Sequence, residues 1–169
     1  MGPKNDPEEG AAKRAAKRVL ENAIKTREVT KLAIQHYSIT HDKRWQIVMF
    51  LGLNRQEGNG IVDMLAIRKN TKNKNADMLE IILIDIKGSE EKAKKIEDNE
   101  NPRIPVKEKD VPRLVEVKNI YHASNIVHAE YLKNGDGDYV LKFYELDSSW
   151  NPKDLMARWT PQKLEEIFK

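Results

Sequence analysis

Apolar and polar positions along the chain predict a long helix followed by three strands. Over residues 9–37, one side of a helix would carry Ala12, Ala16, Val19, Ala23, Thr30 and Tyr37. Residues 44–53 form a short run rich in β-forming residues, which the polar loop NRQEGNG ends. Residues 60–68 and 78–87 are two more apolar runs on either side of a polar turn. This arrangement predicts an antiparallel hairpin.

The second half of the chain predicts a helix and two further strands. Residues 89–109 mix charges of both signs and are predicted to form an excursion from the domain. A helix capped by Asp110 is predicted up to about His122. Residues 125–132 and 139–146 are predicted strands around the turn KNGDGD.

Two dipeptides near the C-terminus predict short terminal helices. Asn151-Pro152 and Thr160-Pro161 each place a capping residue before a proline, a pair typical of a first helical turn. The whole order predicts an α/β protein with a mixed central sheet flanked by helices.

Composition narrows the setting. A chain of 169 residues has the length of one domain, which we assign to residues 11–169, with residues 1–10 as a disordered tail. The sequence has no cysteine, so disulfide frameworks and thiolate metal sites are excluded and a reducing compartment is favoured. No apolar run has the length of a membrane span, and the N-terminus lacks a signal-peptide pattern. We therefore expect a cytoplasmic protein with no membrane partner.

Clusters of basic residues suggest a nucleic-acid partner. Charged residues make up 34% of the chain, although the net charge is only +3. Basic residues outnumber acidic ones over residues 11–35, and the hairpin turn adds Arg68, Lys69, Lys72 and Lys74. Such clusters can neutralise phosphates. The alternative is a solvated helix face and an ordinary polar turn.

Acidic residues interrupt both strands of the predicted hairpin. Because side chains alternate along a strand, Asp85 and Lys87 share a face with Leu83. Asp63 shares a face with Leu65 on the partner strand. Two carboxylates that meet across a hairpin repel each other, and a divalent cation with oxygen ligands would keep both ionised. The alternative is a solvated pair of Asp85 and Lys87 on an edge strand, which contributes little stability.

These residues resemble the PD-(D/E)XK nuclease superfamily, whose members have a restriction-endonuclease-like fold. In that family an acid on the second core strand is followed, on the third, by a second acid, any residue and a lysine. Asp63 and the sequence Asp85-Ile86-Lys87 match, whereas Val62 stands where the family has proline. The resemblance covers roughly residues 9–146. It implies an αβββαβ core, an order that the hydrophobic pattern predicts independently.

The resemblance implies a metal-dependent nuclease, and we expect DNA phosphodiester bonds to be its substrate. Asp63, Asp85 and the backbone carbonyl of Ile86 would hold Mg2+ or Mn2+. Lys87 would orient or deprotonate the attacking water, while the basic turn and the first helix would grip the DNA backbone. Small nucleases of this superfamily often act as dimers, so a homodimer is a further expectation.

A glutamate on the first helix joins the site in many members of the family. Glu28 and Glu21 are the candidates here, although both fall opposite the side of the helix that we expect to be buried. Of the remaining residues, His128 is expected to be a packed or half-exposed strand residue, and Trp45, Trp150 and Trp159 are expected to pack rather than stack on bases.

Two other function classes fit the same sequence. The first is a catalytically inactive nuclease-fold module for nucleic-acid binding or protein assembly. The second is an interaction protein that docks a partner through residues 89–109. The substrate form, whether duplex, branched, nicked or single-stranded DNA, or RNA, is left open by the sequence.

Overall fold

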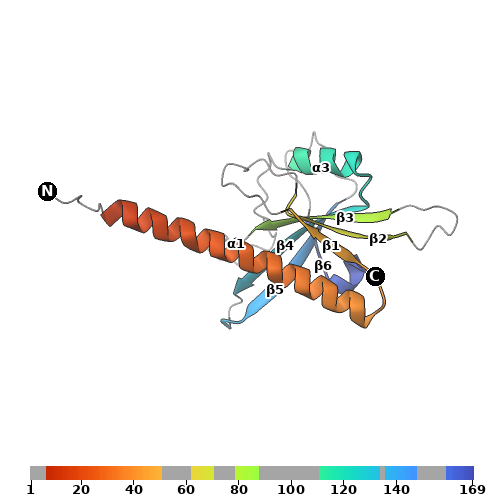
Figure 1. The fold of residues 1–169 in the computed structure, drawn as a ribbon, viewed down its shortest axis with the longest axis horizontal. Coiled ribbons are helices and arrows are strands. Elements are labelled where there is room, and N and C mark those ends of the chain that lie inside the picture. Colours follow the sequence, from red (N-terminus) through yellow and green to blue (C-terminus); the bar gives the residue numbers. More distant parts are fainter. Residues whose placement is uncertain (1–6, 51–61, 71–78, 88–110, 134–135, 148–158) are drawn as a thin grey trace.

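The computed structural model describes residues 7–50, 62–70, 79–87, 111–133, 136–147 and 159–169. Its elements, shown in Figure 1, are α1 (Pro7–Thr40), β1 (Gln46–Met49), β2 (Met64–Lys69), β3 (Leu79–Lys87), α3 (Val111–Ile120), β4 (Asn125–Lys133), β5 (Tyr139–Leu146), β6 (Trp159–Gln162) and α4 (Leu164–Ile167). The predicted order of a helix, three strands, a helix and two strands is therefore confirmed.

The strands form one mixed sheet in which chain order and spatial order coincide. Six strands lie in the order β1-β2-β3-β4-β5-β6. Neighbouring strands are antiparallel except β3 and β4, which are parallel. A parallel pair needs a crossover connection, and α3 lies within it. Helices α1 and α3 lie on opposite sides of the sheet (Figure 1), which confirms the predicted α/β class.

Strand alternation gives each helix its own apolar layer. Ile82, Ile84 and Ile86 of β3 pack with Ile34 of α1, whereas Leu83 packs beneath α3. We call these two sides of the sheet the α1 face and the α3 face. On the α3 face the layer includes Val62, Leu65, Val111, Leu114, Val117 and Ile126.

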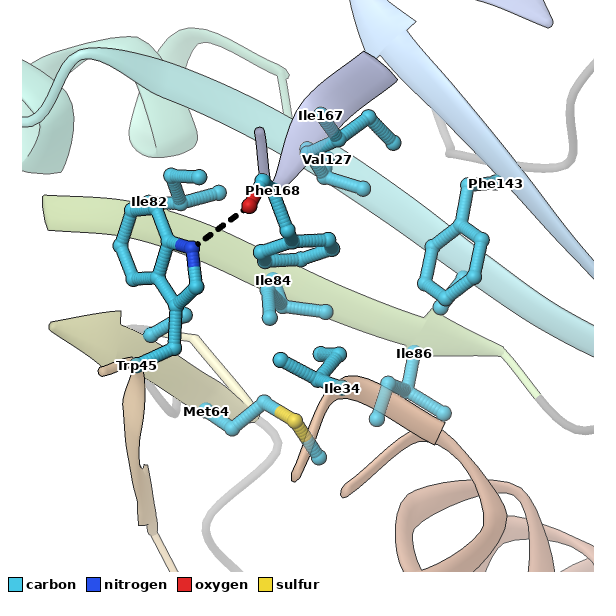
Figure 2. Close-up of a cluster of buried hydrophobic side chains, with 12 residues drawn as sticks. Ile34, Trp45, Met64, Ile82, Ile84, Ile86, Val127, Phe143, Ile167 and Phe168 are labelled. Carbon is cyan, nitrogen blue, oxygen red and sulfur yellow. Dashed lines mark hydrogen bonds between the residues drawn. The ribbon is translucent and has the colours of Figure 1, made fainter. Parts of the chain in front are cut away.

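Trp45 anchors the C-terminus within the layer on the α1 face (Figure 2). Its indole Nε1–H donates a hydrogen bond of 2.9 Å to the carbonyl oxygen of Phe168. The two rings meet edge to face, with centroids 5.6 Å apart. The expectation that Trp45 packs in the core is confirmed, because this side chain is buried.

Helix α1 buries three polar residues and one apolar residue along one side. Thr26, Thr30, Ile34 and Ser38 are buried and recur every fourth residue. Tyr37 is half-buried. None of the helices described in the structure combines the length and the apolar character that crossing a bilayer requires.

The C-terminal prediction was wrong at Thr160-Pro161. These residues belong to β6, and α4 begins only at Leu164. Because β6 is an edge strand, Pro161 can lie opposite Tyr144 without removing a hydrogen bond from the sheet interior. The other dipeptide, Asn151-Pro152, lies outside the described residues.

The predicted tail over residues 1–10 lies only partly within the described residues, and the predicted excursion over residues 89–109 lies wholly outside them. Helix α1 begins at Pro7, inside the segment assigned to the tail over residues 1–10. Residues 1–6 and the whole excursion over residues 89–109 lie outside the described part of the chain.

Candidate functional site at the ends of β3 and β4

The sequence motif gathers at one end of the sheet. Met64, the first residue of β2, lies opposite Ile84 of β3. Asp63 directly precedes β2, and Asp85 directly follows Ile84 along β3. Since the two strands are antiparallel, both acids come to the end of the sheet where β3 finishes. The side chain of Lys87, the last residue of β3, lies outside the described part of the chain.

Asp63 is held by β3 and by α1. Its Oδ2 accepts a hydrogen bond of 2.8 Å from the backbone N–H of Ile86. Its Oδ1 forms an ion pair with the guanidinium of Arg27 on α1. The structure therefore brings Asp63 onto the segment that follows Asp85, with Arg27 balancing its charge. Sequence reasoning missed Arg27.

Asp85 lies on the α3 face beside two residues of β4. It lies opposite His128 in the parallel pairing, and its Oδ2 is 3.3 Å from His128 Nδ1, an ion-pair contact rather than an aligned hydrogen bond. The other ring nitrogen, Nε2, lies 3.1 Å from Oε1 of Glu130. Asp85, His128 and Glu130 are 3%, 0% and 2% exposed. We call these three residues the buried charge cluster.

The carboxylates on both sides of His128 favour its charged form. Burial alone would lower the pKa of His128, but the carboxylates of Asp85 and Glu130 beside its ring nitrogens outweigh burial and raise that pKa. A protonated imidazole between two carboxylates offsets part of the cost of burying them.

Two aromatic rings lie beside His128 of the cluster. The ring of Trp159 meets His128 edge on, with centroids 5.9 Å apart, and the ring of Tyr144 lies 6.3 Å away. Burial and the charge of Glu130 raise the pKa of Tyr144 to about 12. The expected packing roles of His128 and Trp159 are confirmed, but His128 also has the two acidic neighbours that the sequence did not reveal.

The glutamate candidates on α1 are both exposed, as their position opposite the buried side predicted. Glu28 forms an ion pair of 3.8 Å with Lys31. Glu21 lies about two helical turns before Glu28 and is also exposed. The side chain of α1 that reaches Asp63 is that of Arg27.

Arg68, which was predicted to belong to the basic turn, lies in β2 and has a different role. Arg68 was expected to grip a DNA backbone, but it is buried. Its guanidinium pairs with Glu80 at 2.7 Å and lies 4.2 Å from the ring centroid of Trp45. Lys69 is exposed, whereas Lys72 and Lys74 lie outside the described residues.

The chemistry of the donors at this end of the sheet fits a hard divalent cation. Asp63 and Asp85 supply carboxylate oxygens, the ligands that magnesium and manganese prefer. Within the described ranges, no three acidic or histidine side chains form a group arranged to hold a metal ion. An ion at Asp63 would have to replace Arg27 as the positive charge beside it.

Comparison with protein-family models, with curated proteins and with solved structures gives no match to this chain.

Proposed function

We propose that this protein is a metal-dependent nuclease that hydrolyses phosphodiester bonds in DNA, with Asp63, Asp85 and Lys87 at its centre. The hydrogen bond between Ile86 N–H and Asp63 carries the proposal, because it joins the acid before β2 to the acid-x-lysine segment of β3. The order of helices and strands supports a restriction-endonuclease-like core, since it agrees with the order that the resemblance implies.

Each residue would have a separate task. Asp63, Asp85 and the carbonyl of Ile86 would hold Mg2+ or Mn2+, which when bound polarises the phosphate and lowers the pKa of a water ligand. A lysine beside two carboxylates stays protonated, so in the proposed site Lys87 would orient the attacking water. His128 would fix the orientation of Asp85 through the contact at 3.3 Å.

A catalytically inactive module of the same fold is the second candidate, and a specific observation favours it. Arg27 balances Asp63, and His128 lies between Asp85 and Glu130, so each acid already has a partner without an ion. A binding module would need no more than this arrangement.

A cleavage assay decides between the two candidates. Single-stranded, duplex, nicked and branched DNA would be incubated with magnesium, manganese or EDTA. We expect cleavage only with a divalent ion, and a loss of at least about 100-fold in Asp85→Asn and in Lys87→Ala. Asp42→Asn is the matched control, because Asp42 is an exposed carboxylate in the turn after α1.

The assignment is wrong if Asp85→Asn and Lys87→Ala cleave as well as the parent protein. Calorimetric titration with manganese, without DNA, supplies a readout that does not depend on turnover. Binding that weakens in Asp63→Asn supports the nuclease, whereas the absence of binding in the parent protein supports the inactive module.

A further inference from the structure

Two tyrosines and two lysines form an exposed cluster at the β4–β5 hairpin. The rings of Tyr131 on β4 and Tyr139 on β5 are stacked, with centroids 5.1 Å apart. Lys25 Nζ of α1 lies 4.5 Å from the ring centroid of Tyr139 and 5.7 Å from that of Tyr131. Lys133 Nζ lies 5.7 Å from the ring of Tyr139. We call these four residues the Tyr–Lys patch.

The patch is accessible to a ligand. Tyr139 is 41% exposed, and both lysines are exposed. Tyr131 is half-buried and supports Tyr139 from one side. An aromatic ring with two ammonium groups over it offers a stacking surface together with positive charge.

The patch lies on the α1 face, at the end of the sheet where the acids lie, whereas Asp85 is on the α3 face. Strands β2 and β5 begin where β3 and β4 finish, because each is antiparallel to its neighbour. Lys87 lies opposite Glu130, so Lys133 lies three residues farther along β4, or about 10 Å. On α1, Lys25 is two residues from Arg27, the partner of Asp63.

We propose that the Tyr–Lys patch binds an unpaired stretch of DNA, with a base stacked on Tyr139 and phosphates paired with Lys25 and Lys133. Aromatic rings stack on any base, and lysines beside them neutralise the backbone, which is how sequence-tolerant single-strand sites work. In a duplex the faces of the bases are already stacked on one another. The ring of Tyr139 therefore selects unpaired bases.

The lysine contacts already present do not block this binding. A base stacked on an aromatic ring contributes more than an exposed cation–π contact does. A base would therefore displace the ammonium group of Lys25 from the ring, and the ammonium group would pair with a phosphate of the same strand.

The inference names the substrate of the proposed nuclease, DNA with single-stranded character next to the cleaved bond. It rests on the proposed function only for the step from binding to cleavage. Binding is therefore measured in EDTA, where a nuclease of this kind does not cut.

Fluorescence anisotropy of the full chain with labelled DNA tests the patch. The probes are an oligothymidine of about 12 nucleotides, within the length that single-strand sites cover, and a blunt duplex of equal length. We expect Tyr139→Ala to weaken single-strand binding about tenfold and to leave duplex binding unchanged. Tyr139→Phe retains the ring and should bind like the parent protein.

Tyr121→Ala is the matched control, because Tyr121 is 39% exposed and lies after α3, before β4 begins. Salt dependence separates stacking from charge. Replacing Lys25 and Lys133 by glutamine should lower the slope of log Kd against log salt concentration by about 0.7 for each lost phosphate contact on a single strand. Tyr139→Ala should leave that slope unchanged.

The inference is overturned if Tyr139→Ala binds the single strand no more weakly than Tyr121→Ala does, or loses duplex binding equally. Its failure and that of the nuclease are distinguishable. Metal-dependent cleavage that Asp85→Asn abolishes, with binding indifferent to Tyr139, retains the nuclease and rejects the patch. Binding that depends on Tyr139 without cleavage under any condition retains the patch and rejects the nuclease.

Discussion

The two faces of strands β3 and β4 differ in chemistry, although alternate residues of the same two strands supply them. On the α1 face these strands contribute five apolar side chains to the core, namely Ile82, Ile84, Ile86, Val127 and Ala129. On the α3 face the apolar layer under α3 ends after Leu83 and Ile126. Beyond it, toward the ends of the strands, lies the buried charge cluster.

The difference between the two faces suggests separate contributions, with the α1 face stabilising the fold and the α3 face carrying the proposed site. Apolar burial on the α1 face stabilises the fold in proportion to the area removed from water. A buried set of charges is often no more stabilising than apolar residues of similar volume. Buried charges with perturbed pKa values are candidates for a functional site, and we therefore place the proposed chemistry on the side of Asp85.

Removing Trp45 should produce the largest loss of stability. Trp45→Ala deletes a buried ring and its hydrogen bond to Phe168, so the free energy of unfolding should fall by about 4 kcal/mol. Urea unfolding followed by circular dichroism measures it. Trp45→Phe keeps a ring and should lose much less. A loss under about 1 kcal/mol in Trp45→Ala would show that the layer on the α1 face does not anchor the C-terminus.

Replacing His128 should cost less stability but change its pH dependence. His128→Gln leaves two buried carboxylates without the positive charge between them, a loss of about 3 kcal/mol. Because the pKa of His128 is raised on folding, its charged form stabilises the parent protein fully below the unfolded pKa of about 6.5. That contribution is lost as the pH rises through the folded pKa.

The parent protein should therefore lose stability as the pH rises above about 6.5, by up to about 1.4 kcal/mol per pH unit. His128→Gln should remove that slope, and Trp45→Ala should keep it. Unfolding in EDTA over this pH range measures both variants. His36→Gln is the control, because His36 is exposed on α1. A slope that persists in His128→Gln would assign the pH dependence to other groups.

The strands were predictable from sequence because their signal is local. Alternation placed β5 at residues 139–146, the bounds that the structure has, and it put Asp85 on the face of Leu83. At Thr160-Pro161 the same kind of local reasoning failed. A capping residue before proline suits both a helix start and an edge strand, and only the position of β5 decides between them.

The partners of the acids were not predictable because they depend on how distant segments align. Opposite Asp85, a slip of β4 by two residues would keep the apolar pattern but replace His128 by another side chain. Similarly, helix periodicity placed Glu28 opposite the buried side, but it did not show that Arg27 on α1 pairs with Asp63. Long-range register, rather than residue type, determines both contacts.

The Arg27–Asp63 pair should give the smallest change in stability and a gain in ion binding. Its side chains are 28% and 17% exposed, so solvent screens the pair, and Arg27→Gln should cost less than about 1 kcal/mol. The same variant frees a carboxylate oxygen from a competing cation. Manganese affinity, measured by calorimetry, should therefore rise several-fold if Asp63 is a metal ligand. Arg14→Gln, an exposed arginine earlier on α1, should change neither quantity. If the manganese affinity of Arg27→Gln equals that of the parent protein, then Asp63 is an ion-pair partner of Arg27 and not a metal ligand. The pair would then contribute to the stability of the fold, as the apolar layer on the α1 face does.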